Sequence, residues 1–204
     1  MASPADAFDR RNLLTYASLL GGVAAIAAAT GHLTNISGLA IAIAVVADTF
    51  DGRFARRFGT DTRRCALGVE LDSLADAIAF GIAPPLSSAL LLNVGMDLPG
   101  YALWSAVFVH AACAVTRLAS YNLSAAGEKP SRFIGIPVPL AALIWSTALL
   151  VQPSAATTII LILVTAAAMV LPLRIPRPAG AGLVLFTCWP LAVALCHLAF
   201  AIWH

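Results

Sequence analysis

Residues 45–76 read "VVADTFDGRFARRFGTDTRRCALGVELDSLAD" and place Asp48, Asp51, Asp72 and Asp76 beside or inside long apolar runs. The chain is 60% hydrophobic and only 11% charged, whereas soluble domains are roughly 25% charged. Ionised carboxylates in apolar surroundings are costly unless a positive partner compensates them. The fold must therefore supply such a partner, and its nature is the first question that the sequence raises.

The apolar runs predict an all-α fold, a polytopic membrane helix bundle. Runs of about 18 or more apolar residues are candidate spans, because roughly 20 residues at 1.5 Å rise cross a hydrocarbon core of ~30 Å. The sequence offers seven, at about 13–30, 36–57, 65–93, 99–121, 134–152, 155–174 and 178–202.

We expect a single integral membrane domain over residues 1–204. Within it, we expect a short interfacial helix in residues 1–12, a core of six spans over 13–174, and an additional span in 178–204. The first span resembles a cleaved signal peptide only faintly, and its length favours a retained helix.

The basic residues give the orientation. All twelve Lys and Arg residues fall on one side of this layout. They are Arg10 and Arg11 before the first span, Arg53, Arg56, Arg57, Arg63 and Arg64 around the second connection, Arg117, Lys129 and Arg132 around the fourth, and Arg174 and Arg177 around the sixth. The positive-inside rule places that side, with the N-terminus, in the cytoplasm, and the cytoplasmic membrane is the expected location. Topology and anionic phospholipid explain these arginines, so nucleic-acid binding is not expected.

The four aspartates can converge on one small volume. Asp48 and Asp51 are spaced i, i+3 and Asp72 and Asp76 i, i+4, so each pair shares one helical face. The pairs lie roughly 9–14 Å and 12–18 Å from the cytoplasmic ends of their spans, hence at similar depth on antiparallel neighbours. Two divalent cations would offset the negative charge, and oxygen ligands suit Mg²⁺ or Mn²⁺. Two-metal sites commonly clamp a transferring phosphate group.

Small and basic residues flank the aspartates. Gly52 permits close approach of a ligand beside Asp51, and Arg56, next to Ala55, is placed for a phosphate contact. Gly68 begins an i, i+4, i+8 stripe that continues through Asp72 and Asp76. Both glycines could instead serve only helix packing.

The segments "DTFDGRFAR" (48–56) and "GVELDSLAD" (68–76) resemble the motif of the CDP-alcohol phosphotransferase family, D-x2-D-G-x2-A-R followed by G-x3-D-x3-D. In that family an alcohol hydroxyl attacks the lipid-bearing phosphorus of a CDP-linked donor and expels CMP. One departure is the spacer between Arg56 and Gly68, which holds eleven residues, more than is usual in the family. It is expected to lengthen the cytoplasmic loop without moving the carboxylates.

The resemblance implies roles for the motif residues. Asp48, Asp51 and Asp72 would be metal ligands, and Asp76 would be both a ligand and the general base. The remaining motif positions would line the pocket for the CDP moiety; they are Gly52, Ala55, Arg56 and Gly68.

Three further segments are similar to the serine-using branch of the family: "LGVELDSLADAIAFGIAPP" (67–85), "TRLASYN" (116–122) and "RFIGIPVP" (132–139). They imply CDP-diacylglycerol as donor and serine as acceptor, with glycerol phosphate or inositol phosphate as the alternative acceptors. Arg117, Asn122 and Arg132 become candidates for binding the serine carboxylate or a donor phosphate. For the two arginines, anchoring at the membrane surface is the alternative. A homodimer is possible, because dimers are common in the family.

A divalent-cation or proton-coupled transporter would also need carboxylates within the membrane. Transporters usually distribute such groups over inverted repeats. Residues 99–204 contain no repeat of the aspartate pattern, and Glu128 is their only acidic residue. The sequence therefore favours the transferase.

Overall fold

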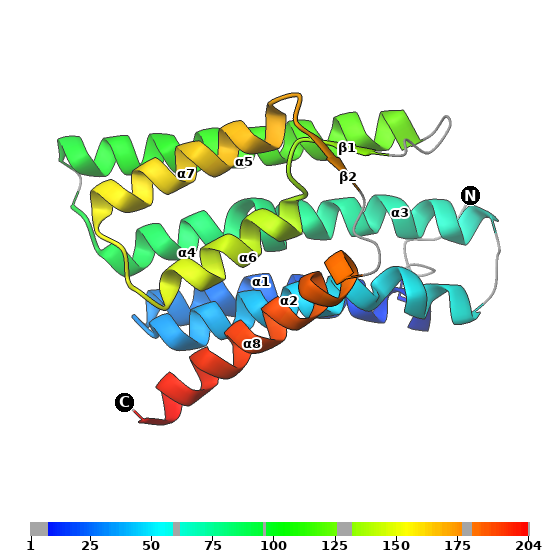
Figure 1. Cartoon of the computed structure of the whole chain (residues 1–204), viewed down its shortest axis with the longest axis horizontal. Coiled ribbons are helices and arrows are strands. Elements are labelled where there is room, and N and C mark those ends of the chain that lie inside the picture. The colour runs from blue at the N-terminus through cyan, green and yellow to red at the C-terminus, as the bar shows by residue number, and fades with distance from the viewer. Residues whose placement is uncertain (1–7, 59–61, 96, 126–131, 177–180, 204) are drawn as a thin grey trace.

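The computed structural model describes residues 8–58, 62–95, 97–125, 132–176 and 181–203. Eight α-helices lie within these residues; α1 to α7 run back and forth along roughly one direction, and α8 crosses them obliquely (Figure 1). Their bounds are α1 Leu13–Thr30, α2 Thr34–Ala55, α3 Thr62–Asp76, α4 Ala83–Leu92, α5 Leu98–Ala125, α6 Val138–Leu149, α7 Ala155–Val170 and α8 Ala181–Trp203. The predicted all-α helix bundle is confirmed.

Shorter elements connect or extend these helices. The 3₁₀-helices η2 (Arg10–Asn12) and η3 (Arg56–Phe58) precede α1 and follow α2, and the π-helix η4 (Ala77–Ile82) joins α3 to α4. The strands β1 (Arg132–Ile134) and β2 (Arg174–Pro176) pair antiparallel. Of the expected interfacial helix in residues 1–12, residues 1–7 lie outside the described part of the chain.

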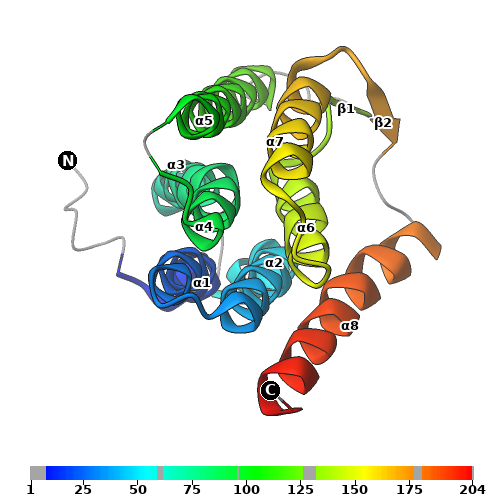
Figure 2. The same cartoon turned by 90° about the vertical axis from the view of Figure 1, so that its left-hand side faces the viewer.

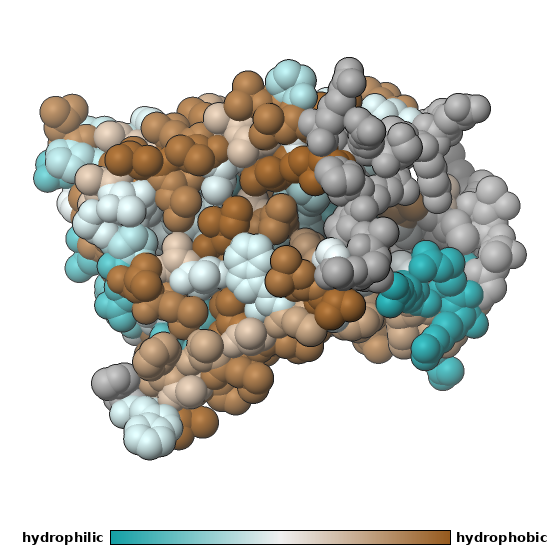
Figure 3. All heavy atoms as spheres, viewed as in Figure 1, coloured by the Kyte–Doolittle hydropathy of each residue, from teal (hydrophilic) through white to brown (hydrophobic). Residues whose placement is uncertain are grey.

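Within the described ranges, five helical segments are long and apolar enough to cross a membrane, and the protein is an integral membrane protein. They are Arg10–Thr30, Thr34–Phe58, Ala66–Leu92, Leu98–Ser124 and Val184–Trp203. Large apolar side chains such as Leu20, Phe108 and Leu195 are exposed on the outside of the bundle, where lipid would cover them. Figure 3 shows this apolar flank, with hydrophilic residues gathered near the end of α2.

The predicted helical spans at 134–152 and 155–174 are wrong in length. Helices α6 and α7 hold 12 and 16 residues, or about 18 and 24 Å. Beside both helices the chain is extended instead, since β1 precedes α6 and β2 follows α7. Backbone pairing satisfies these segments: Gly135 N–H donates to Leu173 O at 2.9 Å and Ile136 N–H to Ala168 O at 3.0 Å. These backbone groups therefore have partners without a helix.

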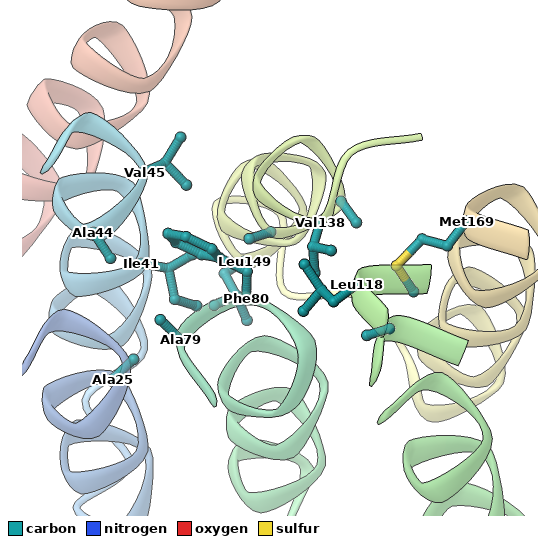
Figure 4. Close-up of a cluster of buried hydrophobic side chains, with 13 residues drawn as sticks. Ala25, Ile41, Ala44, Val45, Ala79, Phe80, Leu118, Val138, Leu149 and Met169 are labelled. Carbon is teal, nitrogen blue, oxygen red and sulfur yellow. The ribbon is translucent and has the colours of Figure 1, made fainter. Parts of the chain in front are cut away.

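The core combines large apolar side chains with many alanines, and small residues allow close helix packing. Ala25, Ile41, Ala79 and Phe80 belong to one buried cluster, which Figure 4 shows between α1, α2, η4 and α6. A Cβ placed on Gly22 would lie 2.6 Å from the Cα of Ala79, so α1 and η4 touch through their backbones. Small residues are the usual means of packing helices in a membrane.

Helix α8 lies at the periphery of the bundle, against α2 and beside α6 (Figure 2). Its fully buried His197 holds it there: the carbonyl of Ser146 can only accept, so Nε2 donates to it, at 2.8 Å. The Trp189 indole N–H donates to Thr147 Oγ1 at 3.1 Å. Two polar contacts with α6 thus hold α8 against the otherwise apolar surface of the bundle.

Candidate functional site

Helices α2 and α3 bring their aspartates together near the middle of the molecule. The two helices run antiparallel (Figure 1). Asp48 and Asp51 lie near the C-terminal end of α2, and Asp72 and Asp76 near that of α3. One carboxylate oxygen from each of Asp48, Asp72 and Asp76 lies within 4.8 Å of the others. Three negative groups at this separation form a candidate cation site.

Asp51 borders this trio. Its carboxyl group lies within hydrogen-bonding reach of Asp72, as that of Asp48 does of Asp76. Thr15 on α1 donates its hydroxyl to Asp51 Oδ2 at 2.7 Å. Asp51 Oδ1 and Asp76 Oδ1 are buried and have no hydrogen-bond partner among the described residues. The cluster therefore offers acceptor oxygens that the described protein groups leave unsatisfied.

Arg117 is the cation that the fold brings to Asp76. It lies on α5, its residue is only 9% exposed, and it interacts electrostatically with Asp76. Its guanidinium also lies over the ring of Tyr121, 5.8 Å from the centroid. Among the described side chains Arg117 is one guanidinium against four carboxyl groups, so ionising all four would require further positive charge, which a bound cation would supply.

The two other candidate acceptor residues are placed differently. The Asn122 amide donates to the Ser73 hydroxyl at 2.9 Å, which ties α5 to α3 one residue away from Asp72. Arg132 begins β1, and its side chain lies outside the described part of the structure. Among the described side chains, Arg117 is thus the candidate next to the aspartates.

The residues expected to line a donor pocket lie nearer the surface than the aspartates. Gly52 and Arg56 are exposed, and Ala55 and Gly68 are half-buried. A Cβ on Gly52 would lie 3.5 Å from Arg56 Nη1, so the arginine side chain passes over the glycine. These positions form the outer part of the site.

Sequence reasoning missed two residues at the start of the first span. A Cβ on Gly68 would lie 3.2 Å from Oδ1 of the buried Asn12, and Thr15 binds Asp51. Asn12 and Thr15 are spaced i, i+3 and share one helical face. Two polar residues with this spacing at the start of an apolar run are the signal that could have identified them.

These observations define the class: an integral membrane helix bundle with an acidic cluster between two antiparallel helices. Residues 11–173 match the family model of the CDP-alcohol phosphatidyltransferases. The chain belongs to the CDP-alcohol phosphatidyltransferase family. Helix α8 lies outside the matched range.

Several curated relatives share the name CDP-diacylglycerol–serine O-phosphatidyltransferase. The protein from Mycobacterium bovis is 38% identical over 134 residues, covering 63% of this chain and 44% of the relative. That from Mycobacterium leprae is 36% identical over 174 residues, covering 80% and 56%. That from Helicobacter pylori is 36% identical over 133 residues, covering 65% and 54%. The chain thus spans about half the length of these relatives.

Proposed function

We propose that the protein transfers a phosphatidyl group from CDP-diacylglycerol to the hydroxyl of serine and releases CMP. The observation that carries the proposal is the convergence of Asp48, Asp72 and Asp76 within 4.8 Å inside a membrane bundle. Family membership and the names of the relatives support the same reaction class.

The acidic cluster fits a divalent metal. Mg²⁺ and Mn²⁺ prefer oxygen ligands, and the cluster supplies carboxylates with buried, unpartnered oxygens among the described residues. We assign Asp48, Asp51, Asp72 and Asp76 as the ligands of two such ions. When bound, the ions would offset the charge of the donor diphosphate and of the departing CMP.

The protein's own residues then have separate tasks. The serine oxygen attacks the phosphorus that bears diacylglycerol, the bond from that phosphorus to the CMP oxygen breaks, and CMP leaves with the bonding electron pair. Asp76 accepts the hydroxyl proton as general base. Gly52, Ala55, Arg56 and Gly68 would bind the CDP moiety from the outer part of the site. The acceptor carboxylate or a donor phosphate would bind Arg117, Asn122 and Arg132.

The test is CMP release by the purified protein with CDP-diacylglycerol and Mn²⁺ or Mg²⁺. Serine, glycerol phosphate and inositol phosphate are supplied separately, and we expect serine to give the highest rate. Asp76→Asn should lower the rate by roughly 100-fold or more, the usual contribution of a general base. Glu70→Gln, a change at an exposed residue of α3, is the matched control and should keep the rate.

Two results would overturn the proposal. One is the absence of CMP with every alcohol, from folded protein that binds Mn²⁺. The other is cation flux in proteoliposomes that Asp72→Asn abolishes, without CMP release, which would indicate a transporter. A higher rate with glycerol phosphate or inositol phosphate would correct the acceptor and keep the reaction class.

A further inference from the structure

A π-helical turn immediately follows the last aspartate of the cluster. Residues Ala77–Ile82 form η4, where the Ala83 N–H donates to the carbonyl of Ile78, five residues back. The turn sits inside an otherwise continuous helical span from α3 to α4. One residue inserted in an α-helix rotates the following segment by about 100° relative to the preceding one. The turn therefore determines the direction about the helix axis in which Asp72 and Asp76 point, relative to the buried face of α4.

The proline pair Pro84 and Pro85 removes two helical hydrogen bonds from this turn, those that the carbonyls of Phe80 and Gly81 would accept. In a regular α-helix the carbonyl of Gly81 would accept from the N–H of residue 85. Residue 85 is a proline and has no N–H to donate. The buried carbonyl of Gly81 therefore needs another donor.

His110 on α5 supplies that donor. Its Nδ1 lies 3.1 Å from the carbonyl oxygen of Gly81. A carbonyl can only accept, so Nδ1 carries the hydrogen. His110 is fully buried, and its other nitrogen, Nε2, has no hydrogen-bond partner among the described residues. Within the described residues, the ring of His110 therefore makes one hydrogen bond, to the carbonyl of Gly81.

The surrounding packing fixes both partners. A Cβ on Gly81 would lie 2.8 Å from the Cβ of Ala114, so α5 packs closely against the turn. The ring of Trp145 meets His110 edge to face, with centroids 6.5 Å apart. Arg117, about two turns along α5 from His110, interacts with Asp76 on the other side of the turn. Helix α5 therefore contacts the π-turn itself at Gly81 and also Asp76, the residue just before the turn.

We propose that His110 is a positioning residue for the acidic cluster. By donating from Nδ1 to the Gly81 carbonyl, it holds the π-turn that directs Asp72 and Asp76 toward Asp48. The affinity of the cluster for a divalent cation then depends on a histidine that does not touch the cation. The inference rests on the proposed function in one respect, namely that the cluster binds a metal.

A purely structural role is the competing explanation, and His197 provides the comparison. It is also fully buried and also donates to a backbone carbonyl, that of Ser146. It does so on α8, where it holds α8 against α6 and α2. Loss of either histidine should destabilise the fold, but only loss of His110 should weaken metal binding.

The experiment compares His110→Leu, His110→Asn and His197→Leu with the wild-type protein in detergent. Mn²⁺ affinity is measured by the EPR signal of free Mn²⁺ during titration, and the melting temperature without metal is measured in parallel. We expect His110→Leu to bind Mn²⁺ roughly 10-fold or more weakly, as for other residues that orient metal ligands. His110→Asn retains an N–H close to the position of Nδ1 and should bind nearly as well as the wild type. His197→Leu should melt at a lower temperature with unchanged Mn²⁺ affinity.

A second pair of variants covers the case in which His110→Leu does not fold. Gly81→Ala forces its new methyl group against Ala114 and should displace the turn, with weaker Mn²⁺ binding. Combining it with Ala114→Gly makes room for the methyl group and should restore the affinity.

The inference is overturned if His110→Leu, or Gly81→Ala, binds Mn²⁺ as tightly as the wild type. Equal losses in His110→Leu and His110→Asn would also overturn it, because the donated hydrogen would then not be the cause. CMP release is recorded on the same wild-type sample. Wild-type protein that binds Mn²⁺ but releases no CMP overturns the proposed function alone, and wild-type protein that binds no Mn²⁺ overturns both.

Discussion

At the level of single residues, the hydroxyl of Thr15 is the described protein group that satisfies an oxygen of Asp51. The contact measures 2.7 Å and is buried. A buried hydrogen bond to a charged group contributes more to folding stability than a neutral one. Removing the donor would leave the buried carboxylate oxygen unsatisfied, at the cost of its desolvation. Thr15 therefore both anchors α1 to α2 and fixes the rotamer of one member of the acidic cluster.

Thr15→Val should weaken the protein at this point, because valine has the shape of threonine without the donor. We expect a loss of about 1–3 kcal/mol of stability, seen as a lower melting temperature. We also expect weaker Mn²⁺ binding in the titration. Thr15→Ser keeps the hydroxyl and is the control. An unchanged Mn²⁺ affinity in the valine variant would mean that Asp51 needs no help in reaching the site.

Sequence analysis could predict the parts of the acidic cluster that depend on local spacing, but not the contacts between residues far apart in the chain. The spacing within each aspartate pair is local, so the sequence indicates which residues share a face. Asp48, Asp72 and Asp76 do lie together, whereas their binding of metal stays a prediction. The contact of Thr15 with Asp51 joins residues 36 positions apart. It follows from the packing of α1 on α2, which no local spacing encodes.

At the level of elements, α8 is held by shape as well as by hydrogen bonds. The ring of His197 lies directly against Gly38 on α2, where a Cβ would overlap it. Ser146 Oγ donates to the carbonyl of the same glycine at 2.8 Å. The helices α2, α6 and α8 thus meet at Gly38, and of the three only α8 lies outside the range matched by the family model.

Gly38→Ala should therefore displace α8. The added methyl group cannot fit beside the His197 ring, and overpacking of this kind costs about 1–3 kcal/mol. The melting temperature should fall, while Mn²⁺ affinity stays at the wild-type value because the aspartates are elsewhere. Adding His197→Ala to Gly38→Ala should recover part of the loss relative to the sum of the single changes. Strict additivity of the two changes would refute the proposed steric contact.

Two elements show where hydropathy alone fails. Residues 134–152 and 155–174 are apolar enough to be predicted as spans, yet α6 begins only at Val138 and α7 ends at Val170. The pairing of β1 with β2 supplies the backbone hydrogen bonds that a longer helix would have supplied. The π-turn lies inside the predicted span at 65–93, where the proline pair Pro84 and Pro85 is the sequence feature that indicates a change in the helix.

At the level of the whole molecule, charge separates the two ends. The exposed Arg53, Arg56 and Arg57 lie where α2 ends, on the hydrophilic side in Figure 3. The turns that end α4 and α6, with Asn93 and Gln152 at positive φ, lie at the opposite end of the bundle (Figure 1). From the positive-inside rule we propose that the end with the arginines faces the cytoplasm.

Cysteine labelling in intact cells tests this orientation. In a chain whose native cysteines are replaced, Gln152→Cys should react with an impermeant maleimide added outside. Arg57→Cys should react only after the membrane is opened. Both positions are exposed, so a difference between them reports sidedness rather than burial. The reverse pattern of labelling would invert the proposed topology.

The unequal helix lengths have a consequence for how a lipid could reach the aspartates. Figure 1 shows that α2, α3 and α5 extend well past the points where α6 begins and α7 ends. Fewer helices therefore surround the half of the bundle where α2 ends and α3 begins than surround the other half. Under the proposed reaction, we expect a double-tailed donor to keep its tails in the surrounding bilayer and to bring its headgroup to the aspartates from the side of the bundle. Substrate entry would then be lateral, and product lipid could leave by the same route without crossing water.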